Sequence, residues 1–345
     1  MVGPGGCRRG RTGSRGDAGW LHSCPVHVRV MGRRWALVGA AALLLLTGCV
    51  AHPTQSEESS ASGGDGGAAA STSPSVTVSA DRPCAAAPAP AAWDHVIWIW
   101  FENKPETGII GSPDASYITT LAASCALATD YHGVAHPSLP NYLAATSGST
   151  NGVADDGAPA AHPLTGPSLF GQVSAADKEW RSYEESMPSA CALTSSGTYA
   201  VKHNPAAYFT SVRSDCARWD VGLDQLDADL AADHLPAFAL VTPDLCHDMH
   251  DCSVSAGDTW LRRTLPALLS SSVYAHGTTA ILITWDEDDS AHDNRVPLLV
   301  VAPSVAPETR IGVKLDHYSL LRTTEQMLGL PLLGSAAQAT PIPGL

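Results

Sequence analysis

The hydrophobic pattern consists of short apolar runs that end in polar side chains. The unbroken run from His95 to Phe101 predicts a central strand that is buried on both faces. Further strands are predicted at Trp180 to Glu185, Ala237 to Thr242, Ala280 to Thr284 and Pro297 to Ala302. The chain therefore contains enough strands for one extended, buried sheet.

Segments with apolar residues at helical spacing lie between and after these runs. They predict helices over Ser116 to Ala128, from Tyr142 onward, over Ser255 to Leu269 and over Tyr318 to Leu328, the last ended by Gly329. Strands that alternate with helices indicate an α/β fold with a mostly parallel sheet. In such folds the functional site lies at the carboxyl ends of the strands.

The first 80 residues show no such alternation. Arg33 and Arg34 precede an apolar run of about 12 residues, shorter than the roughly 20 that span a bilayer. The following Leu46-Thr47-Gly48-Cys49 resembles a bacterial lipobox, with an ordinary secretion signal as the alternative. We therefore expect an extension and signal peptide over 1–48 with a start at Met31, a flexible tether over 49–80, and one folded domain over 81–345.

Export is also consistent with the cysteines. Six follow Cys49, and an even count in an exported chain predicts three disulfides. Among the 15 ways of pairing six cysteines, pairing between neighbours is our prediction: Cys84–Cys125, Cys191–Cys216 and Cys246–Cys252. Zinc ligation is the alternative, and the wide spacing of the cysteines argues against it.

The net charge of the chain argues against some classes of binding partner. The formal net charge is -14, and seven arginines and one acid give residues 1–48 a charge of +6, so that the remainder carries -20. A body this acidic argues against nucleic acid or an anionic membrane surface as a partner. We expect a monomer that meets the membrane only through a lipid on Cys49 and attracts an anionic substrate by a local cationic site.

Two predicted strands end in ligand-type side chains. Glu102 and Asn103 follow the first strand, and a run of acids that begins with Asp286 and Glu287 and continues through Asp288 and Asp289 follows a later one. Parallel strands bring these ends to one edge, where oxygen ligands suit a divalent ion of unspecified identity. A solvated acidic turn is the alternative.

Ser138 lies between two prolines, in His136-Pro137-Ser138-Leu139-Pro140-Asn141-Tyr142, at a predicted helix start. A helix N-terminus favours an anion such as a phosphoryl group, and a serine there can act as a nucleophile if it is activated. The alternative is a serine that only caps the helix. No G-x-S-x-G pattern surrounds it, which argues against acyl transfer.

Histidines form the third component. His203 lies in Lys202-His203-Asn204-Pro205, while His247, Asp248 and His250 lie between Cys246 and Cys252, whose bridge would constrain the turn. Phosphoryl transfer requires positive charge around the equatorial oxygens and a proton donor for the leaving group. Imidazoles together with a metal supply both.

Taken in order, these motifs resemble one family. E-N-K after an apolar strand, H-P-S-L-P-N-Y, K-H-N-P, the segment from Asp244 to Asp251, T-W-D-E-D-D and the segment from His317 to Pro331 are similar to the bacterial secreted acid phosphatases and phospholipase C-like phosphoesterases of the alkaline phosphatase superfamily. The likeness runs from about residue 93 to residue 334. It implies an alkaline-phosphatase-like α/β/α sandwich with a mostly parallel central sheet and one divalent metal ion.

The resemblance also implies roles for particular residues. Ser138 becomes the nucleophile of a phosphoseryl intermediate, His203 and His250 bind phosphate or transfer protons, and Asp248 orients a histidine. Glu102, Asn103, Asp286 and Glu287, with Ser138 facing the same ion, become metal or nucleophile-positioning ligands, and His317 is expected to complete the site. Loops at 149–167 and 189–200 are expected to wall the pocket.

The implied protein is an exported phosphate monoester hydrolase, lipid-anchored at the outer face of the cell membrane or secreted. Its expected substrate is a small phosphate ester or a phospholipid headgroup, with phosphoinositides such as phosphatidylinositol 3-phosphate among the candidates. A phospholipase C-like phosphodiesterase and a non-catalytic surface binding lipoprotein are the alternatives. The intact set of Ser138, His203 and four acids argues against the non-catalytic reading.

Overall fold

The structure, a computed structural model, describes residues 77–345, so the predicted signal peptide, the lipid on Cys49 and most of the tether lie outside the described residues. Eight strands form one sheet in the order β5-β4-β6-β1-β7-β8-β2-β9, and β10 pairs with β3 separately. The strands are β1 (His95–Phe101), β2 (Ala126–Ala128), β3 (Tyr131–His132), β4 (Trp180–Glu184), β5 (Asp220–Gly222), β6 (Phe238–Thr242), β7 (Thr279–Trp285), β8 (Leu298–Val301), β9 (Thr309–Ile311) and β10 (Leu315–Asp316).

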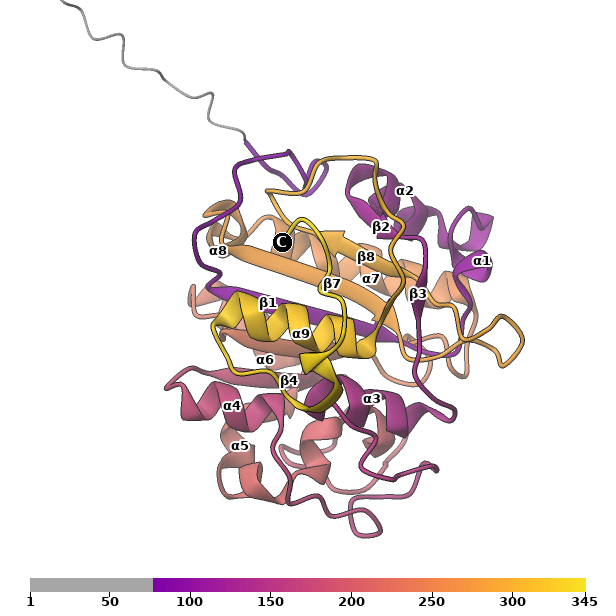
Figure 1. Ribbon diagram of the computed structural model, residues 1–345, viewed down its shortest axis with the longest axis vertical. Coiled ribbons are helices and arrows are strands. Elements are labelled where there is room, and N and C mark those ends of the chain that lie inside the picture. Colours follow the sequence, from indigo (N-terminus) through magenta and orange to yellow (C-terminus); the bar gives the residue numbers. More distant parts are fainter. Residues whose placement is uncertain (1–76) are drawn as a thin grey trace, which may run out of the picture. The chain divides into compact units, whose positions relative to one another are not determined.

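Helices cover both faces of the sheet. They are α1 (Glu106–Ile109), α2 (Ser116–Ser124), α3 (Ser138–Ser147), α4 (Leu169–Ala175), α5 (Cys216–Trp219), α6 (Asp224–Ala231), α7 (Val254–Leu269), α8 (Ser272–Ala275) and α9 (His317–Leu328), with short 3₁₀ turns at Pro113–Ala115, Val201–His203, Pro205–Tyr208, Thr210–Asp215 and Gly334–Ala337. In Figure 1, α9 crosses in front of β1, with α3 and α4 on the same side, and α7 lies behind the sheet. The predicted α/β/α sandwich is confirmed.

The sheet places the ends of three buried strands side by side. β1 lies between β6 and β7 and runs parallel to both, with Phe101 opposite Trp285 in the ladder. Among the described strands of this sheet, β8 alone runs against its neighbours. Every residue of β1 from Val96 to Phe101 is buried, as the apolar run predicted. The residues that follow β1, β6 and β7 therefore leave the same edge of the sheet.

The helix predicted over Ser116 to Ala128 is wrong in its second part. The helix ends at Ser124, and Cys125, which is bonded to Cys84, takes an extended conformation. Ala126–Ala128 then forms β2, which pairs with β8 and β9. Alanine favours a helix when local propensity decides, but here tertiary pairing and the disulfide decide instead.

The other predicted elements occur within a few residues of their expected bounds. The largest difference is α3, which begins at Ser138 and not at Tyr142, so that Pro140 falls in its first turn. Proline is tolerated there because the first amides of a helix have no intrahelical partner.

All three predicted disulfides are present: Cys84–Cys125, Cys191–Cys216 and Cys246–Cys252. The zinc alternative for these six cysteines is therefore wrong. Within residues 77–345, no helix combines the length and the apolar character that crossing a membrane requires.

Candidate active site

Ser138 lies in the first turn of α3, where its hydroxyl faces the carboxylate that follows β1. Its Oγ donates to Glu102 Oε2 at 2.9 Å, and the Tyr142 hydroxyl donates to Glu102 Oε1 at 2.6 Å. Positions four apart share one face of a helix, so Ser138 and Tyr142 approach the same acid. All three side chains are buried. Glu102 thus fixes the direction of the serine hydroxyl.

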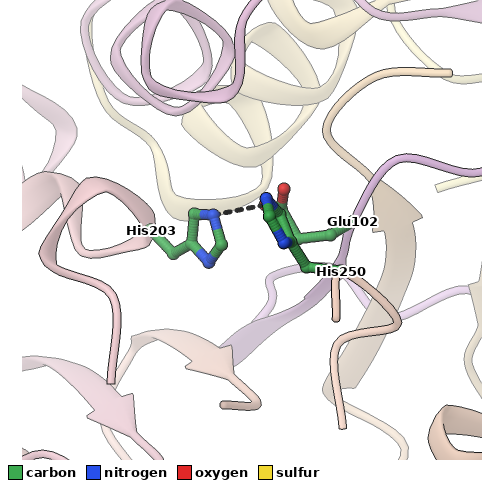
Figure 2. A group of neighbouring side chains, drawn as sticks. All are labelled: Glu102, His203 and His250. Carbon is green, nitrogen blue, oxygen red and sulfur yellow. Dashed lines mark ion pairs between the residues drawn. The ribbon is translucent and has the colours of Figure 1, made fainter. Parts of the chain in front are cut away.

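His203 is held between two buried carboxylates. Its Nε2 lies 3.3 Å from Glu102 Oε1 (Figure 2). Its Nδ1 lies 3.2 Å from Asp248 Oδ2. Burial, the largest single effect, would lower the pKa of His203, but the two neighbouring carboxylates, Glu102 and Asp248, together raise it. Burial would likewise raise the pKa of Glu102, and His203 lowers it. The pair is therefore an imidazolium and a carboxylate. Ligand atoms of Glu102, His203 and His250 also lie within 4.8 Å of one another.

Lys202 brings a second positive charge to Ser138. Its Nζ lies 3.4 Å from Ser138 Oγ, 3.0 Å from Asp156 Oδ2 and 3.3 Å from His250 Nε2. Burial would lower the pKa of Lys202, and Glu102 and Asp156 raise it, so the ammonium stays charged. Because an ammonium only donates hydrogen bonds, His250 Nε2 is the acceptor in this contact.

The carboxylate of Asp286, directly after β7, is buried and only partly hydrogen-bonded. Its Oδ1 accepts the backbone N–H of Asn103 at 3.0 Å, whereas Oδ2 has no hydrogen-bond partner among residues 77–345. Burial, with the charges of Glu102 and Glu287, raises the pKa of Asp286 well above its usual range. Burial, with Glu102, raises the pKa of Glu287 to about 8. Such crowding of acids is what a bound cation relieves.

The residues present fit a divalent metal. The five that the sequence predicted as its ligands, namely Glu102, Asn103, Ser138, Asp286 and Glu287, follow β1 and β7 or begin α3 at this edge of the sheet. The group whose ligand atoms lie within 4.8 Å of one another here is Glu102, His203 and His250. Asn103 is joined to the group through its backbone N–H, in a left-handed conformation with φ 54°. The unpartnered Asp286 Oδ2 is the clearest sign of the fit. Oxygen donors of this kind suit hard or borderline ions without selecting one.

The four consecutive acids have different environments, which the sequence did not separate. Glu287 Oε2 lies 2.7 Å from His136 Nδ1 and 3.5 Å from Asn141 Nδ2. Asp288 is buried and accepts backbone amides of its own loop, while Asp289 is exposed. The alternative of a solvated acidic turn therefore holds for Asp289 and is wrong for the other three.

His317 does not reach the serine. Its Nε2 donates to the backbone carbonyl of Asp286 at 2.6 Å, and its Nδ1 lies 2.7 Å from the Tyr131 hydroxyl. Burial lowers the pKa of His317 to about 4, so the ring is neutral. His317 is consequently placed to position the loop after β7, and the expectation that it completes the site directly is corrected.

Four residues near the serine were not predicted as site residues. Tyr142 had a signal, because it follows Ser138 by one helical turn, and Lys202 precedes His203 in a motif already noted. His136 lies two residues before Ser138. Asp156 comes from the loop at 149–167, which was expected to wall the pocket, but nothing in the Gly- and Pro-containing sequence of that loop singles this residue out.

The fold, a mostly parallel sheet between helices, is similar to that of solved proteins with little sequence identity to this chain. A protein in the alkaline phosphatase superfamily from Vibrio parahaemolyticus matches with a TM-score of 0.51 at 11% identity, covering 76% of this chain and 72% of the other. The lipoteichoic acid synthase LtaP from Listeria monocytogenes matches with a TM-score of 0.51 at 9% identity, covering 75% and 80%.

The family follows from the sequence comparisons. The chain belongs to the Phosphoesterase family, whose model matches residues 100–331. It is 33% identical over 262 residues to a phosphatidylinositol-3-phosphatase of Mycobacterium tuberculosis, covering 74% of this chain and 84% of the relative. It is 30% identical over 256 residues to a phosphate-repressible acid phosphatase of Penicillium chrysogenum, covering 70% of this chain and only 61% of that protein. The chain is thus a hydrolase of phosphate esters.

Proposed function

We propose that the chain is an exported acid phosphatase that cleaves phosphate monoesters through a phosphoserine at Ser138. The observation that carries the proposal is the pairing of Ser138 Oγ with the buried Glu102 at 2.9 Å, beside the ammonium of Lys202 at 3.4 Å. A hydroxyl held in one direction next to a fixed positive charge suits in-line attack on a phosphoryl group.

Each side chain of the site has its own role in the proposed reaction. Ser138 Oγ attacks phosphorus while Lys202 stabilises the charge on the phosphoryl oxygens. His250 Nδ1 lies 2.6 Å from Asp251 Oδ1, which orients the ring so that Nε2 faces the site. We assign the proton transfers to His250, whose Nε2 accepts the proton that Ser138 loses and passes it to the leaving oxygen. In the second half His250 accepts a proton from the attacking water and returns it to Ser138 Oγ as the phosphoserine bond breaks. His203 is enclosed by carboxylates and balances the charge of Glu102.

The proposed mechanism includes a divalent metal ion. A divalent ion held by the carboxylates after β1 and β7 would lower the pKa of the serine hydroxyl and neutralise phosphoryl charge. Asp286 Oδ2, buried and without a partner among the described residues, would face it.

The substrate and the location are also proposed. A phosphoinositide headgroup is a candidate because one relative is named a phosphatidylinositol-3-phosphatase. Export is supported by the three disulfides, which persist in oxidising compartments. We retain a monomer with a lipid on Cys49 as the proposed form.

Hydrolysis of p-nitrophenyl phosphate and of bis(p-nitrophenyl) phosphate across acidic to alkaline pH tests the proposal. The wild type should cleave the monoester and Ser138→Ala should lose this activity. Ser147→Ala is a matched control, because Ser147 lies on the same helix and donates to the Leu143 carbonyl away from the site. Preference for the diester would assign phospholipase C-like activity, and full activity of Ser138→Ala would exclude the serine mechanism.

A further inference from the structure

A carboxylate already lies at the start of α3, beside the nucleophile. Asp156 belongs to the loop between α3 and α4, and its Oδ1 accepts the backbone N–H of Leu139 at 3.0 Å. Its Oδ2 accepts from Lys202 Nζ, also at 3.0 Å. The same ammonium lies 3.4 Å from Ser138 Oγ. The two oxygens of Asp156 thus join a helix amide to the cation that faces the serine.

These donors are the ones that a phosphoryl group requires. Leu139 N–H points out of the N-terminus of a ten-residue helix, and the next residue, Pro140, has no N–H to offer. Lys202 supplies the charge. Nearby, His203 Nε2 lies 3.3 Å from Glu102 Oε1, so the imidazolium adds positive charge to this corner of the site.

We propose that Asp156 is an internal competitor of the substrate, a carboxylate that occupies the phosphoryl-binding donors of the free enzyme and is displaced by a phosphate dianion. The inference rests on the proposed function, which takes Ser138 as the residue attacked by the phosphoryl group. A dianion and the carboxylate compete for the single N–H of Leu139, and their like charges repel when both lie beside Lys202.

Displacement requires the side chain to move and leaves the loop in place. The loop backbone is attached on the C-terminal side of Asp156, where the Tyr208 hydroxyl donates to the Gly157 carbonyl at 2.9 Å and Leu164 N donates to the Tyr208 carbonyl at 2.9 Å. The Asp156 side chain is 30% exposed, so rotation about its own bonds can carry the carboxylate into water. The enzyme therefore binds phosphate with the affinity of the fraction in which Asp156 has turned away.

A positioning role for Asp156 makes the opposite prediction. If Asp156 serves to hold Lys202 in place, its neutralisation weakens phosphate binding. If it competes, neutralisation strengthens binding. Whether neutralising Asp156 strengthens or weakens phosphate binding therefore distinguishes the competing role from the positioning role.

The test is the dissociation constant of inorganic phosphate, measured by titration calorimetry on the full chain, with KM for p-nitrophenyl phosphate beside it. Asp156→Asn should tighten phosphate binding and lower KM by about tenfold, as expected if roughly a tenth of the free enzyme is open. Asp155→Asn is the matched control, because Asp155 is exposed and contacts His162 and Gly157 N instead. Lys202→Met should weaken binding and remove the effect of Asp156→Asn. Unchanged or weaker binding in Asp156→Asn overturns the proposal.

A second variant and a readout that does not depend on turnover make the result unambiguous. Asp156→Ser keeps an oxygen for Leu139 N–H without a charge and replaces Asp156→Asn if that variant does not fold, as judged by its melting curve. Calorimetry needs no turnover, so tighter phosphate binding in a chain that hydrolyses no monoester would uphold the competitor and refute the phosphatase. Turnover with no gain in binding would do the reverse.

Discussion

At the scale of single residues, the site depends on how many partners Glu102 serves. Its two carboxylate oxygens accept hydrogen bonds from Ser138 and Tyr142 and face the imidazolium of His203. A buried charge of this kind is tolerated only when it is paired and hydrogen-bonded. The orientation of the Ser138 hydroxyl is therefore tied to the stability of the chain.

Tyr142→Phe separates these two effects. Removing a hydrogen bond to a buried carboxylate should cost about 1.5–3 kcal/mol of unfolding free energy, measured by urea denaturation. It should also lower kcat, because Glu102 becomes free to turn away from Ser138. Tyr274→Phe is the control, since the Tyr274 hydroxyl is buried and donates to the Pro83 carbonyl. Equal kcat values for Tyr142→Phe and wild type would contradict the role given to Glu102.

Asp286→Asn tests the metal site through stability. Without metal, the variant should be at least as stable as the wild type, because an amide replaces a buried acid with one unpartnered oxygen among the described residues. With metal at about 100 times its Kd, the wild type should gain about 2.7 kcal/mol and the variant much less. Melting curves with and without chelator measure both. A wild type whose melting temperature ignores chelator would show that no ion is held there.

At the scale of elements, burial was a better guide than intrinsic propensity to which strands could be predicted from the sequence. β1 and β7 were predictable because both are apolar along their whole length and lie in the middle of the sheet. The three-residue strands β2, β5 and β9 were missed, since each pairs through contacts made by residues far away in the chain. Local pattern carries no information on such pairing.

The residues of the site likewise differ in how far the sequence predicts them. Glu102 and Asp286 were predictable because each directly follows a recognisable strand, and parallel strands bring their ends together. The loop at 149–167 was expected at the pocket, but Asp156 itself was not predictable, because its contacts with Leu139 and Lys202 form only once α3 and the K-H-N-P turn have packed. Lys202 was seen but not assigned, since a lysine beside a histidine carries no sign of the serine it will face.

Two disulfides should act differently on stability and on activity. Loop-closure entropy predicts a loss of about 3.5 kcal/mol when Cys191–Cys216, with a separation of 25, is replaced by serines, and about 2.4 kcal/mol for Cys246–Cys252, with a separation of 6. The smaller loop carries Asp248 and His250, so its loss should reduce kcat more. Urea unfolding and initial rates on both double variants check this. The same ranking in both measurements would argue against a role for the 246–252 turn in holding the site.

At the scale of the whole molecule, buried acids make stability depend on pH. Burial raises the pKa of Asp220 from 3.8 to about 7, and burial together with Asp220 raises the pKa of Glu184. A raised folded pKa means that the folded state binds the extra proton. Its contribution is present in full below about pH 4 and disappears as the pH rises through about 7. The protein thus keeps this part of its stability in acid, where an acid phosphatase works.

Asp220→Asn isolates that contribution. The amide resembles the protonated acid and keeps an oxygen for Asn204 Nδ2, which lies 2.8 Å from Asp220 Oδ1. Relative to this variant, the wild type should lose stability on the order of 4 kcal/mol between about pH 4 and pH 8. Urea unfolding across that range measures the difference, and Asp227→Asn, at an exposed position, controls for the loss of one charge. A wild type that gains stability over the variant as pH rises would reverse the sign and refute the assignment.

The ladder between β1 and β7 also limits which length changes the gene can tolerate. Because Phe101 lies opposite Trp285, Glu102 and Asp286 leave the sheet at the same level. A single inserted codon inside either strand would slide one carboxylate past the other and turn alternate side chains to the opposite face. Such an insertion would inactivate the enzyme while leaving every site residue intact. Homologues should therefore differ in length in their loops and hardly ever within these two strands.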